Sequence, residues 1–171
     1  QLNRLSDQYF WGEDLIVAPV VNQGATSRLV TLPKGMWVDY QTGELLQGEQ
    51  TLTASASMEE IPLFIREGGF LVQSMEDLQH TKEYDSDSIR IRHLVHTDGQ
   101  SSSALWYHDD GATAGNHLEN RYNLMKLTGA TEGLISSITL EKQVINLESP
   151  ERWIELMVYG LDHQPRSVTL N

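Results

Sequence analysis

Alternation of apolar and polar residues recurs along the chain and predicts β-strands in most segments. In the stretch SIRIR, Ile89 and Ile91 alternate with arginines. In WIELMVY, the residues Ile154, Leu156 and Val158 fall on one face. A period of two is typical of strands with one buried face. We therefore expect strands in both stretches and few helices in the chain.

A second kind of apolar run lacks this alternation. The run LIVAPVV, residues 15–21, is apolar throughout and rich in β-branched side chains, as is typical of a strand covered on both faces. Pro19 within it indicates an edge position or a bulge, because proline donates no hydrogen bond to a sheet. The run IPLFI, which contains Pro62, has the same character.

Turn-forming residues separate these runs at short intervals. They occur at Pro33 to Gly35, Thr42-Gly43, Gln47-Gly48, Gly68-Gly69 and Asp98-Gly99. Such spacing is typical of hairpins and of meandering antiparallel sheets. The predicted fold class is therefore all-β, an antiparallel β-sandwich.

The polar segment SMEDLQHTKEYDSDS, residues 74–88, interrupts the strand pattern with the longest stretch of acidic and turn-forming residues. We place a domain boundary there. The boundary predicts two successive small sandwiches, a proximal one over residues 1–76 and a distal one over residues 77–171. A single sandwich with one exposed loop or short helix is the alternative.

Composition and charge narrow the classes of partner. The chain has 171 residues, enough for two small domains with a core each. Its 24 acidic and 12 basic residues give a net charge of −12, which repels nucleic acid and anionic membrane surfaces. No apolar run approaches the roughly 20 residues of a membrane-spanning helix. The first ten residues lack the pattern of a secretory signal, and the compartment is left open.

The absence of cysteine excludes disulfides and thiolate chemistry. The chain also shows no HExxH motif and no G-x-S-x-G elbow, so the sequence gives no reason to expect a zinc site or a serine nucleophile. No cofactor is expected.

The most concentrated polar cluster is WYHDDGATAGN, residues 106–116. Adjacent strand residues point to opposite faces, so Asp109 and Asp110 are poorly placed to be the two facing carboxylates of a glycosidase, which stand about 5 Å or more apart. Two interpretations stay open. The loop is either a calcium site, built from carboxylate and backbone oxygens, or a turn in which the carboxylates accept hydrogen bonds from loop N–H groups.

Aromatic side chains are the other candidates, because exposed rings can stack on sugars. The candidates for carbohydrate binding are Trp37, Trp106, Tyr107 and Trp153. A tryptophan in a β-sandwich is often a core residue instead. We expect Trp37 to be largely buried on a hairpin strand that follows a turn at Gly35.

Several motifs together carry a resemblance to a known family. They are LIVAPV preceded by Gly12 and Asp14, the hairpin LPKGMWVDYQTGE, the strand IPLFIREGG, and the turn YHDDG. From about Gln8 to Gly115 the sequence resembles the region just after the catalytic barrel of glycoside hydrolase family 31. His108 stands where the family usually has an acidic residue, and the closing stretch VYGLDHQPRSVTLN fits only loosely.

The resemblance implies the C-terminal β-sandwich portion of an α-glycosidase, beside a (β/α)8 barrel. The family's nucleophile and acid/base aspartates lie on barrel strands that precede this region, so no catalytic residue is expected in this chain. The parent enzyme is expected to hydrolyse α-glycosidic bonds by a retaining mechanism with two carboxylates.

The partner implied by the resemblance is the catalytic barrel. Apolar faces carrying Leu15, Val17 and Val20 are expected to cover the flank of the barrel, and they would favour self-association if the chain were separated from it. Two alternatives remain, a carbohydrate-binding module and a structural or oligomer-forming domain.

Overall fold

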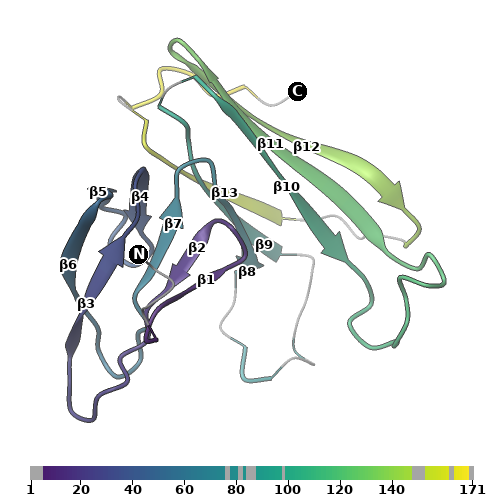
Figure 1. Ribbon diagram of the computed structural model, residues 1–171. Helices are drawn as coiled ribbons and strands as arrows, with labels where there is room; N and C mark the ends of the chain where they lie inside the picture. Colours follow the sequence, from purple (N-terminus) through teal and green to yellow (C-terminus); the bar gives the residue numbers. More distant parts are fainter. Residues whose placement is uncertain are drawn as a thin grey trace.

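The computed structural model describes residues 6–75, 78–80, 83, 88–97, 99–147, 153–161 and 164–169. Within these ranges the regular structure is strand, with no α-helix, and the predicted all-β fold is confirmed (Figure 1). The strands are β1 (Tyr9–Trp11), β2 (Leu15–Val17), β3 (Ser27–Leu32), β4 (Met36–Asp39), β5 (Leu45–Gln47), β6 (Gln50–Ser55), β7 (Leu63–Arg66), β8 (Phe70–Ser74), β9 (Ser88–Leu94), β10 (Ser101–His108), β11 (Asn123–Glu132), β12 (Ile135–Ile145) and β13 (Trp153–Tyr159). No helix in the described ranges is long and apolar enough to cross a membrane.

The strands form four sheets, in the orders β1-β2-β7-β4-β5, β3-β6, β13-β9-β8 and β10-β11-β12. Figure 1 shows the β3-β6 ribbon at one end, the sheet of β10 to β12 at the other, and the β13-β9-β8 sheet between them. Pairing is antiparallel except between β13 and β9, which run parallel. The predicted meander accounts for the pairs of consecutive strands, such as β8-β9 and β10-β11-β12, but not for β2-β7, β3-β6, β4-β7 or the parallel pair β13-β9.

The first core lies between the five-stranded sheet and the β3-β6 ribbon. Ile16, Trp37 and Phe64 from the sheet meet Val30 and Leu32 from β3, and all five are almost fully buried. Trp37 lies on β4 as expected, and its indole Nε1 donates a hydrogen bond to the Pro33 carbonyl oxygen at 2.9 Å. Gly35 has a φ of 120°, a conformation that suits glycine, so the expected turn is confirmed.

A second core covers the opposite face of the same five-stranded sheet. Leu15, Val17 and Ile65 pack there against Leu94 of β9. The prediction of a strand covered on both faces is therefore confirmed for β2. The expectation that Leu15 and Val17 cover the barrel flank is wrong, because β9 of this chain already covers them.

The position of Pro19 also differs from expectation. β2 ends at Val17 and lies between β1 and β7, so it is an internal strand of its sheet. The strand stops before the proline, and Ala18 makes the last hydrogen bond, from its N–H to the Pro62 carbonyl oxygen at 3.0 Å. The chain therefore needs neither an edge position nor a bulge to accommodate Pro19.

A third core lies between the β13-β9-β8 sheet and the β10-β11-β12 sheet. Its centre contains Ile89 and Ile91 of β9, as the SIRIR alternation predicts, together with Trp106, Met125 and Leu127. Beside it, buried His93 stacks on Phe70 with ring centroids 3.9 Å apart and an interplanar angle of 9°. The Nδ1 atom of His93 lies 2.9 Å from the Gly69 carbonyl oxygen and makes a hydrogen bond with it.

The predicted boundary between residues 76 and 77 lies outside the described residues. On either side of it, β8 and β9 pair antiparallel in one sheet. The faces of β9 contribute to two different cores, with Ile89 and Ile91 on one side and Leu94 on the other. The β13-β9-β8 sheet therefore joins the two halves of the chain.

Candidate functional site: the Asp109 and Asp110 loop

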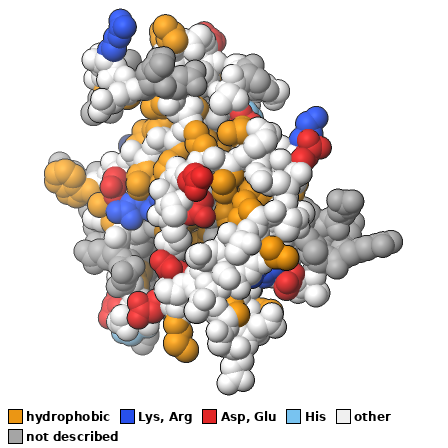
Figure 2. Space-filling view, turned by 90° about the vertical axis from the view of Figure 1, so that its left-hand side faces the viewer, with side chains coloured by type: hydrophobic (Ala, Val, Ile, Leu, Met, Phe, Trp, Pro, Cys, Tyr) orange, Lys and Arg blue, Asp and Glu red, His pale blue; other side chains and the backbone are white. Residues whose placement is uncertain are grey.

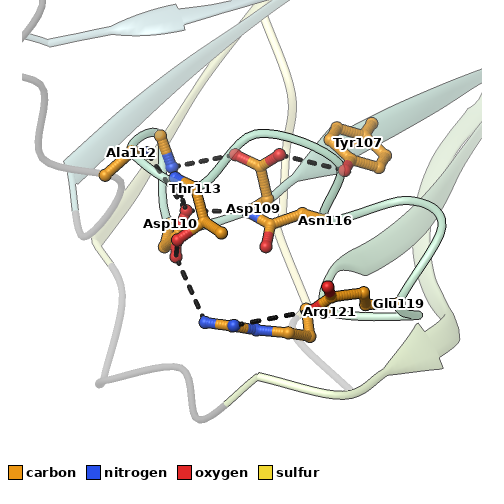
Figure 3. A network of polar contacts seen from close by, with 9 residues as sticks. Tyr107, Asp109, Asp110, Ala112, Thr113, Asn116, Glu119 and Arg121 are labelled. Atoms are coloured by element: carbon orange, nitrogen blue, oxygen red, sulfur yellow. Dashed lines mark hydrogen bonds and ion pairs between the residues drawn. The ribbon is translucent and has the colours of Figure 1, made fainter.

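The loop after β10 gathers the polar cluster that the sequence singles out. Strand β10 ends at His108, and Gly111 takes a positive φ of 63° that turns the chain away from the sheet. Asp109 bridges the strand end and the turn. Its Oδ1 accepts a hydrogen bond from the Gly111 N–H at 2.8 Å, and its Oδ2 accepts one from the Tyr107 hydroxyl at 2.9 Å (Figure 3).

Asp110 is the centre of the network in Figure 3. Its Oδ1 accepts hydrogen bonds from the N–H groups of Ala112 at 3.0 Å and Thr113 at 2.9 Å, and from Nδ2 of Asn116 at 2.7 Å. Its Oδ2 accepts one from the Thr113 hydroxyl at 2.6 Å and lies 3.5 Å from Nη2 of Arg121. The two oxygens therefore receive donors from the loop itself.

These donors favour the ionised carboxylates. The hydroxyl and N–H of Thr113, followed by the N–H of Ala112, hold the pKa of Asp110 far below its ordinary value. The N–H of Gly111 lowers the pKa of Asp109 in the same way. Both groups are carboxylates at neutral pH, and neither has the raised pKa of a general acid.

The arrangement supports the turn interpretation of this loop. Calcium takes six to eight oxygen ligands, whereas the oxygens of Asp110 are already surrounded by N–H and O–H donors and by the Arg121 guanidinium. A calcium ion would have to displace these donors. In the described part of the chain, no group of three or more acidic or histidine side chains is placed to hold a metal ion.

The structure places the aromatic candidates in different environments. Trp37 is fully buried and Trp106 nearly so, and both belong to cores. Tyr107 is 44% exposed, and its ring stacks on Tyr122 at a centroid distance of 5.2 Å. Trp153, on β13, is 78% exposed. The four side chains therefore do not form one binding surface.

Sequence reasoning missed one exposed tryptophan. Trp11 is 70% exposed at the end of β1, an edge strand. Three consecutive aromatic residues, YFW, were the available signal, because alternation in a strand leaves at least one of them on each face. The exposed Trp11 and Trp153 belong to different sheets, so they do not form the paired platform of a binding module.

The fold defines the class of the protein, an all-β module built from several mainly antiparallel sheets. Residues 1–71 match the family model described as the Glycosyl hydrolase family 31 C-terminal domain. Residues 1–71 are therefore identified as the C-terminal domain of glycoside hydrolase family 31, a region that forms only a small part of the proteins it matches.

Similar proteins extend this match beyond residue 71. Alpha-glucosidase 2 of Bacillus thermoamyloliquefaciens is 35% identical over 109 residues, which cover 64% of this chain and 14% of that protein. The alpha-xylosidase of Saccharolobus solfataricus is 26% identical over 169 residues, covering 96% of this chain and 22% of that protein. A Flavobacterium johnsoniae dextranase of the same family superposes with a TM-score of 0.81 at 27% identity, covering 95% of this chain and 20% of its own. The chain spans less than a quarter of each relative.

Proposed function

We propose that the chain supports the catalytic (β/α)8 barrel of a retaining α-glycosidase. The names of the two curated relatives, alpha-glucosidase and alpha-xylosidase, denote enzymes that act on α-linked sugars. Since the matched region is a small fraction of each relative, the role that suits this chain is to cover and stabilise the larger catalytic part. Hydrolysis itself is assigned to the carboxylates of that part.

The observation that carries the proposal is the exposed aromatic face of β1. Tyr9 and Trp11 are 56% and 70% exposed. Their register partners on β2, Val17 and Leu15, lie on the same face of the sheet. β9 covers this face at β2 but leaves it exposed at the edge strand β1. A bare aromatic edge beside a covered apolar face is typical of a contact with another domain.

The test compares Trp11→Ala in two settings. In the chain alone the side chain is mostly solvated, so we expect a change in unfolding free energy within about 0.5 kcal/mol. In the full-length enzyme the ring would be buried against the barrel, and the same change should cost about 3 to 5 kcal/mol. Urea unfolding of both proteins measures the two values, and an equal, small effect in both would contradict the proposal.

A separated chain should also associate with itself. Besides β1, the side of the molecule formed by β3, β5 and β6 carries exposed leucines, Leu29 and Leu45, and Figure 2 shows hydrophobic side chains among acidic ones across this side. This property favours the second candidate function, a structural or oligomer-forming domain. Sedimentation of the chain over a range of concentrations distinguishes a monomer from an oligomer.

We also propose the division into a proximal sandwich, residues 1–76, and a distal one, residues 77–171. The first core draws only on residues between Ile16 and Phe64. The third core draws on residues between Phe70 and Leu140. The first core lies within the proximal range and the third core mostly within the distal one, which supports two units. Phe70 in the third core and Leu94 in the second join the two units across the β13-β9-β8 sheet.

A further inference from the structure

One face of the β13-β9-β8 sheet is partly open. Alternation along β9 places Ile89 and Ile91 in the third core and turns Arg90 and Arg92 to the opposite face. On this face Arg90 lies between Gln73 of β8 and Glu155 of β13, its direct register partners. The three side chains form one cross-strand row.

The row is polar, and its charges are balanced. The Nε of Arg90 donates to Oε2 of Glu155 at 2.6 Å, and both side chains are partly exposed. The Gln73 amide makes hydrogen bonds with the Tyr40 hydroxyl, at 3.0 and 3.2 Å. A guanidinium has four N–H groups besides the one on Nε, and a carboxylate has a second oxygen. The row thus combines planar donors and acceptors without a net charge.

In the next cross-strand row on this face, Arg92 is covered by Tyr40, which marks one end of the exposed surface. The guanidinium of buried Arg92 lies 4.1 Å from the centroid of the Tyr40 ring. Its Nη1 donates to the Tyr40 carbonyl oxygen at 3.3 Å and to the Tyr159 hydroxyl at 2.5 Å. Tyr40 therefore closes the face on this side, and the row that contains Arg90 is the first one open to solvent.

An exposed tryptophan lies at the other end. Trp153 precedes Glu155 by two residues on β13, so both side chains lie on the same face, with Cα atoms about 7 Å apart. Across the row, Gln73 and Glu155 are separated by two strand spacings, about 10 Å. Trp153 is 78% exposed and offers an uncovered ring. The surface formed by Trp153, Glu155, Arg90 and Gln73 therefore has the size of one or two sugar rings.

We propose that Trp153, Glu155, Arg90 and Gln73 form a binding surface for a neutral, α-linked gluco-oligosaccharide. The indole ring stacks on the C–H face of one sugar, while the carboxylate, guanidinium and amide bind neighbouring hydroxyls. A neutral ligand fits because Arg90 and Glu155 compensate each other, and because the net charge of −12 disfavours an anion. The α-linkage rests on the proposed function as part of an α-glycosidase.

The test is calorimetric titration of the chain with isomaltotriose and maltotriose, with the β-linked cellotriose as a control sugar. We expect weak, saturable binding of at least one α-linked trisaccharide and none of cellotriose. Trp153→Ala should weaken binding about tenfold, and Trp153→Phe should retain most of it, because the smaller ring still stacks. Trp11→Ala is the matched control, since it removes an equally exposed tryptophan from another sheet.

Three results would overturn the proposal. They are no saturable binding of either α-linked sugar, equal binding of cellotriose, and equal losses in Trp11→Ala and Trp153→Ala. Circular dichroism confirms that each variant is folded. Because the titration uses this chain alone, its failure leaves the barrel-supporting role standing, and that role is tested separately by Trp11→Ala in the full-length enzyme.

Discussion

Trp37→Ala should be among the most destabilising substitutions in the chain. The ring is fully buried in the first core, which also contains Ile16 and Phe64, and the centroid of the Phe10 ring lies 6.2 Å away. Truncation of a buried tryptophan to alanine costs about 3 to 5 kcal/mol through lost burial and the cavity left behind. The lost indole hydrogen bond accounts for about 1 kcal/mol of that total. The Pro33 carbonyl oxygen keeps a second donor, the Glu49 N–H at 3.2 Å, so it is not left unpaired.

Urea unfolding of the parent chain, Trp37→Ala, Trp37→Phe and Trp11→Ala measures this effect. Trp37→Phe keeps most of the volume and should cost about 1 to 2 kcal/mol, which separates the lost hydrogen bond from the cavity. The exposed Trp11 is the control, with an expected change within about 0.5 kcal/mol. A loss below about 1 kcal/mol for Trp37→Ala would refute the reasoning, because it would show that the buried ring contributes little to the stability of the first core.

Two further predictions concern titratable groups. Burial lowers the pKa of His93, so the unfolded chain binds a proton more readily than the folded one. The free energy of unfolding should therefore keep the contribution of neutral His93 above about pH 6.5 and lose it as the pH falls below that value. Urea unfolding at several pH values should show this loss, and His93→Phe should flatten the profile in this range. The hydrogen bonds to Asp110 lower its pKa, so its contribution is present above about pH 4 and is lost as the pH falls through the lowered value. Asp110→Asn should therefore lower the melting temperature at neutral pH, whereas millimolar calcium should leave the melt of the unaltered chain unchanged relative to chelator. A rise of several degrees with calcium, absent in Asp110→Asn, would establish a calcium site instead.

The strands and their buried faces were predictable where sequence period and local turns determine them. The SIRIR alternation identifies Ile89 and Ile91 as core residues, and the apolar run before Pro19 identifies a strand that is buried on both faces. The neighbour that covers each face was not predictable. Leu15 and Val17 are apolar whether β9 or a separate domain packs on them, because burial depends on area and not on the identity of the partner. The parallel placement of β13 is likewise invisible in its alternation, which is the same in either direction.

In the candidate sites, too, the local turn was predictable from the sequence, whereas the contacts with distant residues were not. The turn at Asp109 and Asp110 follows from local chemistry, since aspartate and glycine side by side favour backbone capping. The part played by Asn116 and Arg121 depends on how the loop folds back, and the local sequence does not specify it. Whether a tryptophan is exposed depends on the sheet packed above it, so the strand sequences around Trp106 and Trp153 could not distinguish the buried ring from the exposed one.

The parallel pairing of β13 with β9 bears on how the chain is made. Arg90 and Glu155 are neighbours in the sheet although 65 residues separate them in the chain. During synthesis, β8 and β9 leave the ribosome and can pair well before β13 exists. Until β13 is made, the edge of β9 opposite β8 has no partner strand, and β9 carries apolar residues on both of its faces. The nascent chain is therefore most exposed to wrong pairing during this interval, and a pause in translation between β9 and β13 would prolong the risk.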